Sequence, residues 1–294
     1  MTSSALSIKM HTLTRTSRSR DWFIIVLFAL SAFLYSIRFE DVGGGSTTFD
    51  ISNDAYDPRI GEIRSLAGLE DAARHRIVKT GNDKRDLALA LTKVVELHTV
   101  HGVARQTWRQ NWIANSLDSL AFMDASFAGK MLPEELVKEN IAFCSQASQI
   151  LQELFRRNGI LQATVRFNVG GVPPHSAVAA KPDGVWRYYD PSLEPTEEGI
   201  PFDSLMAPGK FLELYAAEKW RSKGVDQKFE NLARDGKIAI IDIDGQGPLR
   251  GIAFQRLTTI LSVHGWTVPM LIAIWLLYRR GRKDRAHYPS PKSL

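Results

Sequence analysis

The segment Asn140-Ile-Ala-Phe-Cys144-Ser-Gln-Ala147 contains the only cysteine of this 294-residue chain and begins a predicted helix. Apolar residues follow it at helical spacing, and Gly159 comes after Arg-Arg-Asn, an order typical of a helix C-terminus. We therefore predict a helix from about Asn140 to Asn158, with Cys144 in its first turn. Unpaired backbone N–H groups and the positive end of the helix dipole favour a thiolate at that position.

A half-buried strand is predicted directly after this helix, because apolar and polar residues alternate from Leu161 to Val169. Two further short strands, His175 to Lys181 and Val185 to Asp190, flank a Pro-Asp-Gly turn and form a predicted hairpin. A two-residue turn would place His175 directly opposite Asp190, roughly 5 Å away at Cβ. A bulged glycine in the turn would shift the register by one residue and separate the two side chains, unless a second bulge corrected it.

This stretch resembles the transglutaminase-like superfamily of papain-related thiol enzymes, in the form of a membrane-anchored bacterial-type member. The matching features are a cysteine near the start of a helix that ends in Arg-Arg-Asn-Gly-Ile, a strand, His175, an Asp-Gly turn, Trp186 and Asp190-Pro-Ser. The resemblance implies an α+β fold, in which the helix with the cysteine packs on an antiparallel sheet that carries the histidine and aspartate. Ser145 and Ala177 replace aromatic residues common in the family, which bears on the shape of the acyl-acceptor tunnel.

Three residues have the chemistry of a thiol catalytic triad. Cys144 would attack an amide carbonyl, His175 would help to generate the thiolate and then protonate the leaving amine, and Asp190 would orient the imidazole. Backbone N–H groups at the helix start, including that of Cys144, would bind the oxyanion of the intermediate. The alternative for a lone cysteine is a small buried hydrophobic residue without reactivity.

Four more side chains are candidates for the oxyanion site or the substrate cleft. Gln146 follows the cysteine closely, although a solvated helix residue explains it equally well. Trp108 and Trp112 precede the central helix and are either core residues beneath it or a wall of the cleft. Trp186 belongs to the stretch that carries the family resemblance.

Two apolar segments flank the central part of the chain. Trp22 to Ile37 has 16 residues, slightly fewer than the roughly 20 that a spanning helix needs. A cleaved signal peptide is the alternative, but no convincing cleavage site follows. Leu257 to Tyr278 has 22 residues, no charge apart from a possible one on His264, and five mostly basic residues after it. Since cations precede the first segment and follow the second, we predict that both termini are cytoplasmic and the central domain is periplasmic or extracellular.

The expected organisation has six parts. These are a basic cytoplasmic tail (1–20), a first transmembrane helix (21–39), a linker and helical N-terminal part of the external domain (40–135), a transglutaminase-like catalytic core with a C-terminal extension (136–250), a second transmembrane helix (257–278) and a second basic cytoplasmic tail (279–294). Outside the central stretch, we expect helices over Ile60–Ala73, Asp83–His98 and Phe211–Arg221, a loop over Pro191–Pro208 and a strand over Lys237–Ile243.

The composition limits the possible partners. The chain is 44% hydrophobic and 23% charged, which suits one ordinary folded domain with additional segments. Much of its formal charge of +5 lies in the two tails, so the basic balance fits membrane orientation and no nucleic-acid partner is expected. His98 and His101 have no third ligand at a metal-binding spacing, and we expect neither a metal nor a cofactor. The expected partners are a peptide-like or protein substrate, the lipid bilayer and envelope proteins.

Two functions from different classes are consistent with these features. The first is a membrane-anchored cysteine enzyme that acts on amide or peptide bonds through a thioester, by hydrolysis or by acyl transfer to an amine. The second is a non-catalytic, membrane-tethered binding or assembly module for envelope or polysaccharide-export machinery, which keeps the same fold, since fold does not determine function.

Overall fold

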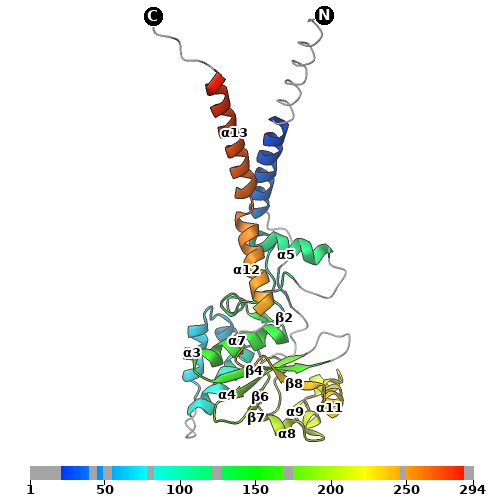
Figure 1. The fold of residues 1–294 in the computed structure, drawn as a ribbon. Coiled ribbons are helices and arrows are strands. Elements are labelled where there is room, and N and C mark those ends of the chain that lie inside the picture. The colour runs from blue at the N-terminus through cyan, green and yellow to red at the C-terminus, as the bar shows by residue number, and fades with distance from the viewer. Residues whose placement is uncertain are drawn as a thin grey trace, which may run out of the picture. The chain divides into compact units, whose positions relative to one another are not determined.

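The computed structural model describes residues 21–39, 45–48, 55–77, 83–120, 127–168, 175–245 and 249–287. The chain has an α+β fold that divides into two compact units (Figure 1). We call residues 1–43, 107–117 and 257–294 the helical unit, and residues 44–106 and 118–256 the α+β unit. The expected boundary between residues 135 and 136 falls inside the α+β unit. The expected boundary at residue 250 falls within the helix Leu249–His264.

The elements of the α+β unit are β1 (Thr47–Thr48), α2 (Pro58–Gly61), α3 (Leu66–Arg74), α4 (Asp83–His98), β2 (Val100–Val103), α6 (Pro133–Leu136), β3 (Ile141–Ala142), α7 (Cys144–Arg157), β4 (Leu161–Phe167), β5 (Ser176–Lys181), β6 (Arg187–Tyr189), β7 (Ile200–Pro201), α8 (Phe202–Leu205), α9 (Lys210–Leu214), α10 (Glu218–Arg221), α11 (Val225–Arg234) and β8 (Ile238–Ile241). The helical unit contains a helix over Asp21–Ser36, η1 (Ile37–Phe39) and α13 (Thr267–His287). Two helices, α5 (Trp108–Leu120) and α12 (Leu249–His264), have residues in both units.

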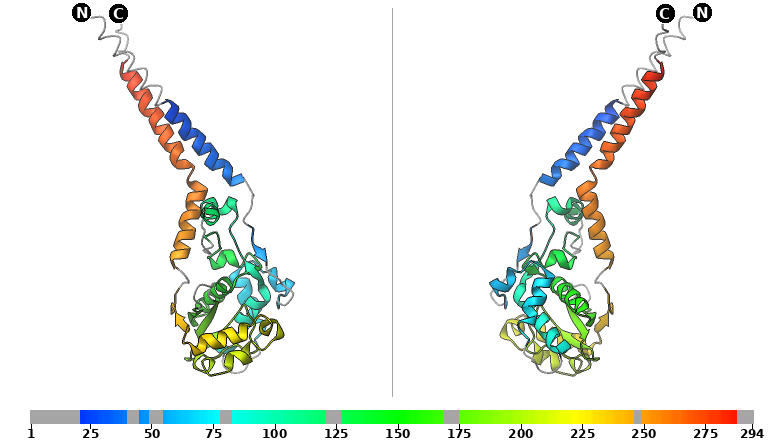
Figure 2. Two further views of the ribbon diagram at one scale, coloured as in Figure 1. Left: turned by 90° about the vertical axis from the view of Figure 1, so that its right-hand side faces the viewer. Right: turned by 90° about the vertical axis from the view of Figure 1, so that its left-hand side faces the viewer.

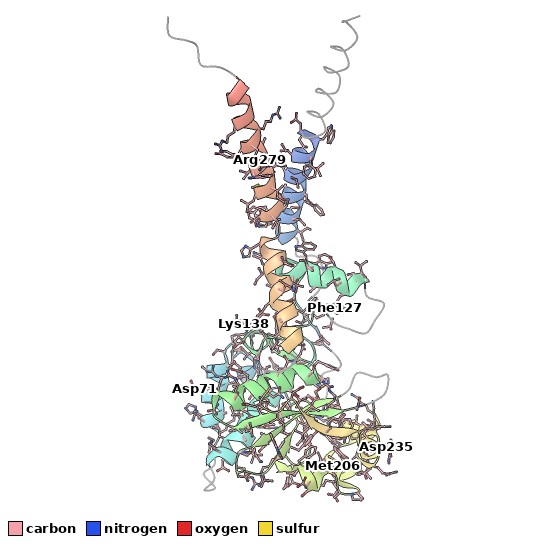
Figure 3. All side chains as sticks on the ribbon, viewed as in Figure 1. Asp71, Phe127, Lys138, Met206, Asp235 and Arg279 are labelled. Carbon is pink, nitrogen blue, oxygen red and sulfur yellow. The ribbon has the colours of Figure 1, made fainter. Side chains whose placement is uncertain are left out.

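A five-stranded sheet in the order β7-β6-β5-β4-β8 forms the centre of the α+β unit, and every neighbouring pair in it is antiparallel. Helices cover both faces (Figures 1 and 2). On one face, α3, α4 and α7 pack against residues such as Val178 and Tyr189. On the other face, α8 to α11 pack against residues such as Ala179 and Tyr188. Side chains fill the space on both sides of the sheet (Figure 3), and the pleat sends alternate residues of each strand into the two cores.

The start of α7 is fixed by a small second sheet and one glutamine. In this sheet β2 pairs with β1 and, in parallel, with β3, which leads directly into the N-cap residue Phe143. The Gln146 side chain is buried and makes four hydrogen bonds to backbone groups. Its Oε1 accepts from the N–H groups of Phe143 and Ala104 at 3.0 Å each, and its Nε2 donates to the carbonyls of Ala104 and Lys130 at 2.8 and 2.9 Å. The first turn of α7 is thereby held against the neighbouring backbone.

The hairpin register differs from the one expected for a two-residue turn. Ala179 pairs with Tyr188 and Ala180 with Arg187, which is the last pair of the ladder, so six residues connect the two strands. Arg187 Nη2 donates to Asp183 Oδ2 at 2.6 Å, and this ion pair closes the longer loop. The direct pairing of His175 with Asp190 is therefore wrong. Because the shift is two residues, both side chains keep the same face and lie as diagonal neighbours.

Several predicted boundaries change for identifiable reasons. The helix begins at Cys144, because Ile141 and Ala142 are used in β3. The segment from Ile60 to Ala73 splits into α2 and α3, Phe211 to Arg221 splits into α9 and α10, and the expected loop over 191–208 contains β7 and α8. The helix α4 has the bounds predicted from the sequence. Val169, the last residue of the strand predicted from Leu161, lies outside the described residues.

The long apolar helix expected over Leu257–Tyr278 is interrupted. α12 ends at His264 and α13 begins at Thr267, with a bend of 46° between them. Pro269 explains the break, since it lacks an N–H group and its ring would clash with the carbonyl four residues earlier in a continuous helix. In the first turn of a new helix a proline is tolerated.

Within the helical unit, the helix Asp21–Ser36 packs along α13. Ile24, Leu27 and Ala273 form a small buried cluster, and Ser31 Oγ donates to the Trp266 carbonyl at 2.8 Å. Most other large apolar side chains of these helices remain exposed, among them Trp22, Phe33 and Leu271 at 67%, 61% and 63%. In the described part of the chain, no helix taken singly has the length and apolar content to cross a membrane, whereas α12 and α13 meet that requirement together as a bent pair.

We predict that Gln146→Leu lowers the free energy of unfolding by about 3 kcal/mol. The N–H groups of Phe143 and Ala104 and the carbonyl of Lys130 lose their bond to the side chain, whereas the Ala104 carbonyl still accepts from the Lys130 N–H at 2.9 Å. Urea-induced unfolding of the purified chain measures this loss. Gln227→Leu, at an exposed position on α11, is the matched control and should change stability little. Equal stability of both variants would show that the hydrogen bonds of Gln146 do not fix the start of α7.

Candidate active site

Cys144 is the first residue of α7 and is 3% exposed. The first N–H groups of a helix have no partner inside it. Those of Gln146 and Ala147 donate to the Phe143 carbonyl at 2.8 Å, and among the described residues no hydrogen bond is recorded for those of Cys144 and Ser145. Two backbone donors are therefore available at the residue that carries the thiol and at the next one, which is the kind of donor that an oxyanion site uses.

His175 lies immediately before β5, and its ring is held by two aromatic side chains. The ring centroid is 5.0 Å from that of Phe167 and 5.1 Å from that of Phe229, which stacks on it at 24°. The side chain keeps 9% of its surface exposed. Its Nε2 lies 2.7 Å from Asp190 Oδ2, and the side chain of Cys144 is near enough to contribute to the raised pKa of His175. Since Nε2 contacts the carboxylate, Nδ1 is the ring nitrogen that remains available to the thiol.

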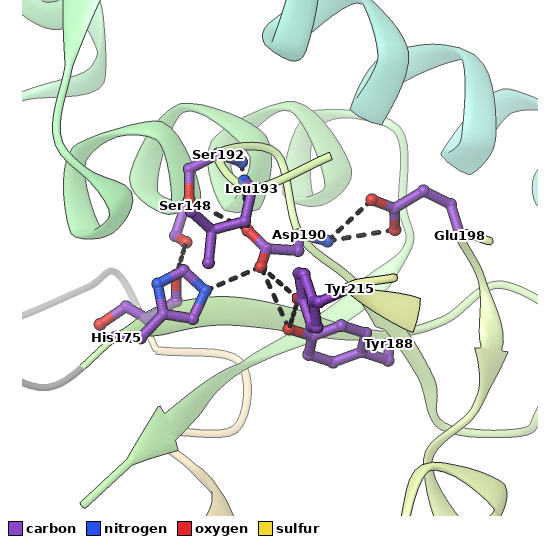
Figure 4. A network of polar contacts seen from close by, with 9 residues as sticks. Ser148, His175, Tyr188, Asp190, Ser192, Leu193, Glu198 and Tyr215 are labelled. Carbon is purple, nitrogen blue, oxygen red and sulfur yellow. Dashed lines mark hydrogen bonds and ion pairs between the residues drawn. The ribbon is translucent and has the colours of Figure 1, made fainter. Parts of the chain in front are cut away.

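Asp190 follows β6 and has no exposed surface. Figure 4 shows the contacts that surround its carboxylate. Oδ2 accepts from His175 and from the hydroxyls of Tyr215 and Tyr188 at 2.6 and 3.2 Å, and the two hydroxyls are 2.7 Å apart. Oδ1 accepts from the N–H and hydroxyl of Ser192 at 3.1 and 3.0 Å and from the N–H of Leu193 at 3.2 Å. Each oxygen thus has three donors.

These contacts set the protonation of the pair. Burial alone would lower the pKa of His175, but the charge of Asp190, the hydrogen bond to it and the side chain of Cys144 raise that pKa from 6.5 to about 10. Burial alone would raise the pKa of Asp190, but His175 and the hydrogen bonds from Tyr215 and the Ser192 N–H lower it from 3.8 to about 2. At neutral pH the pair is an imidazolium and a carboxylate, which is the state that stabilises a thiolate.

A second acidic group supports the backbone of Asp190. The carboxyl oxygens of Glu198 lie 3.1 and 3.2 Å from the Asp190 nitrogen and accept its N–H (Figure 4). Burial and the nearby charges of Glu96 and Asp190 raise the pKa of Glu198 well above 4.5. Glu96 is 4% exposed, and Lys93 Nζ donates to it at 2.6 Å. The raised pKa favours the neutral form of Glu198, which places no second full charge beside the carboxylate of Asp190.

Ser148 joins the cysteine helix to the histidine strand. Its hydroxyl lies one turn after Cys144 and donates to the carbonyl of Ser176 at 3.0 Å (Figure 4). Because Ser176 directly follows His175, this bond fixes the distance between α7 and the start of β5. The site therefore forms where the N-terminus of α7 and the ends of β5 and β6 meet.

The other sequence candidates are not brought into this cluster. Both amide atoms of Gln146 are engaged by backbone groups, so the side chain is a poor oxyanion donor. Trp186 lies at the turn end of the hairpin, with Lys181 Nζ 5.5 Å from its ring. Trp108 and Trp112 belong to the helical unit, where the Trp112 indole donates to the Ser262 carbonyl at 3.3 Å. Among the described residues, no group of three His, Cys, Asp or Glu side chains could bind a metal ion.

Sequence reasoning missed Tyr188, Tyr215, Phe229 and Glu198. The Asp-Pro-Ser order after β6 is a pattern in which an aspartate accepts from the N–H two residues on, so the local half of the Asp190 network was readable. Tyr188 lies two residues before Asp190 and shares its face of the strand. Tyr215 and Phe229 come from distant helices, and no local pattern indicates them.

Comparison of the chain with models of protein families, with curated proteins and with solved structures gave no match.

We predict a pH dependence of stability that belongs to the His175–Asp190 pair. The folded-state pKa of His175 is above its ordinary value, so its contribution is complete below about pH 6.5 and is lost as the pH rises towards 10, with a slope of up to about 1.4 kcal/mol per pH unit. The contribution of Asp190 is present above pH 3.8 and is lost as the pH falls towards 2.

The measurement is urea unfolding between pH 6 and 9.5. Asp190→Asn should flatten the decline of the unfolding free energy over this range, because a neutral amide does not hold the imidazolium. Asp235→Asn, an exposed partner of Lys237, should keep the wild-type decline. An unchanged slope in Asp190→Asn would contradict the assigned ion pair.

Proposed function

We propose that this chain is a transglutaminase-like cysteine enzyme that acts on amide or peptide bonds through a thioester. The observation that carries the proposal is the convergence of Cys144, His175 and Asp190. The arrangement also supports the family assignment. A helix that begins with the cysteine packs on an antiparallel sheet, the histidine precedes one strand of that sheet, and the aspartate follows the next.

The chemistry follows from the geometry. The Cys144 thiolate attacks the carbonyl carbon of an amide and forms a C–S bond, while the oxyanion accepts from the N–H groups of Cys144 and Ser145. The imidazolium of His175 transfers its Nδ1 proton to the amide nitrogen, and the C–N bond breaks to release the amine. Water or a second amine then attacks the thioester, gives its proton to His175 and restores the thiolate. Asp190 keeps its charge throughout and orients the ring.

A second function is favoured by one specific observation. Cys144 is 3% exposed and lines neither of the two cavities beside α7. A closed thiol suits a non-catalytic, membrane-tethered binding or assembly module that keeps the fold and uses its surface to hold an envelope partner. The two functions differ in the reactivity of the thiol.

We predict that iodoacetamide alkylates Cys144 at pH 6 and that His175→Ala slows the reaction by about ten-fold or more, because the imidazolium that stabilises the thiolate is gone. Mass spectrometry of the intact chain is a direct readout, since the protein has a single cysteine. His75→Ala, at an exposed position, is the control and should react as the wild type does. Equal rates in the wild type and His175→Ala would favour the binding module.

We further propose that the protein is anchored in a membrane by the helix Asp21–Ser36 and by the α12–α13 pair. Their exposed apolar side chains support this, since a soluble surface rarely carries so many in one region. Aromatic residues suited to the interface accompany them, and Arg279 lies 4.0 Å from the ring centroid of Trp275. Because cations flank the outer ends of both segments, the two termini are cytoplasmic and the α+β unit is external, where it meets envelope peptides or proteins.

The topology predicts the behaviour of two reporter fusions. Alkaline phosphatase inserted at Gly44 should be active, because it folds only outside the cytoplasm, and the same reporter after Lys283 should be inactive. Green fluorescent protein, which fluoresces only when it folds in the cytoplasm, should be dark when inserted at Gly44 and fluorescent when fused after Lys283. An inactive phosphatase at Gly44, in a fusion shown to be intact by immunoblot, would contradict the external placement of the α+β unit.

A further inference from the structure

Two adjoining cavities run along α7 in the α+β unit, and together we call them the α7 groove. Their volumes are about 160 and 370 Å³, and they share three lining residues, Met131, Gln149 and Gln152. The smaller cavity is also lined by Ser145 and Ser176, which are the chain neighbours of Cys144 and His175. The groove therefore starts beside the candidate active site and continues towards the C-terminal end of α7.

The groove lies between β4 on one side and the segment after Met131 with the first turns of α12 on the other. The polar face of β4 contributes Gln162, Thr164 and Arg166. On the other side, Gln255 of α12 ties that helix to the segment after Met131, because its Oε1 accepts from the Met131 N–H and its Nε2 donates to Glu135, both at 2.7 Å. The groove is thus a built feature of the α+β unit.

The strongest indication of a ligand comes from two glutamine side chains in the groove lining. Gln149 and Gln162 are 7% and 1% exposed, and within the described residues the Oε1 atom of each lacks a hydrogen-bond partner. Buried polar atoms nearly always have a partner, and exceptions gather at sites that another molecule completes. Both atoms are acceptors, so the missing partner is an N–H or O–H donor.

Charge and shape select among the possible donors. The lining contains three arginines and three carboxylates, which balance formally: Arg156, Arg166, Arg256, Glu134, Glu153 and Asp242. A polyanion or polycation therefore gains little there. None of the lining residues is aromatic, so neither a sugar ring nor a base finds a ring face to stack on. The larger cavity has an apolar side, which includes Leu132 and Ile252, and a side lined by the amide groups of glutamines. An extended peptide, with polar main chain and varied side chains, matches this combination.

The groove follows α7 from Ser145 to Arg156, a length of about 17 Å at about 1.5 Å per residue. An extended chain covers that distance with about five residues. We propose that the α7 groove binds an extended peptide segment of about five residues on one side of the reacting bond, with main-chain N–H groups donating to Gln149 and Gln162. The inference rests on the proposed function and names its substrate class.

The test uses the full-length chain and a pool of random-sequence pentapeptides, acetylated and amidated at their ends. A peptide in the groove should shield the thiol, so alkylation of Cys144 by iodoacetamide should slow about ten-fold at a peptide concentration near ten times the Kd. Gln149→Leu should raise the half-protecting concentration about ten-fold, as expected for one lost hydrogen bond at a buried acceptor. Arg166→Ala, at an exposed position in the groove lining, is the second groove variant and should also weaken protection while the fold is kept. Gln227→Leu on α11 should protect as the wild type does.

A readout other than binding separates a ligand contact from a structural one. Gln149→Leu should leave the thermal midpoint unchanged or raise it, because it removes an acceptor that has no partner. Pentapeptides that fail to protect, or that protect wild type and both groove variants alike, would overturn the proposal. So would stronger protection by chitopentaose, which would assign the groove to a glycan. If the pentapeptides do not slow alkylation but alkylation still depends on His175, the peptide-binding role of the groove is wrong and the proposed function is unaffected.

Discussion

The hydrogen bond between His175 and the buried carboxylate of Asp190 is the interaction on which the rest of the site depends. A carboxylate without solvent is unfavourable unless its charge is matched and its lone pairs are occupied. Here the imidazolium supplies the charge, and five other donor contacts complete the six around the two oxygens. Because Nε2 is committed to this bond, the orientation of the ring is fixed, and its second nitrogen remains available to a neighbouring group.

That carboxylate can be satisfied only after the sheet and the helices on its far face have assembled. Ser192 and Leu193 come from the local turn, but Tyr215 follows α9, and Phe229, which stacks on the imidazole, lies on α11. On the near face, Ser148 ties α7 to the start of β5. The triad therefore draws on both helical layers, so the cooperative packing of the α+β unit and the alignment of the three groups are linked.

The sequence predicted the elements whose signals are local. Apolar periodicity located α4, α7 and β4, and the residue types and their spacing suggested Cys144, His175 and Asp190 as candidates. The hairpin register was not predictable, because the loop length depends on the Asp183–Arg187 ion pair, which competes with a tighter Pro-Asp-Gly turn. Long-range partners such as Tyr215 have no local signal. The break before α13 was missed because overall hydropathy concealed the effect of Pro269 on helix continuity.

The α7 helix shows how one element can serve structure and function on separate faces. Ala147, Ile150, Leu151 and Leu154 are fully or almost fully buried and pack into the core with α3 and α4. The adjoining face carries Ser145, Ser148, Gln149 and Gln152 and lines the groove beside the polar face of β4, where Gln152 Nε2 donates to Thr164 Oγ1 at 2.9 Å. Apolar residues there would have closed the space between helix and sheet and increased stability, since buried acceptors without partners are unfavourable. Their absence, together with the N–H groups of the first turn, is the arrangement expected if α7 positions both the thiol and a bound chain, as proposed above.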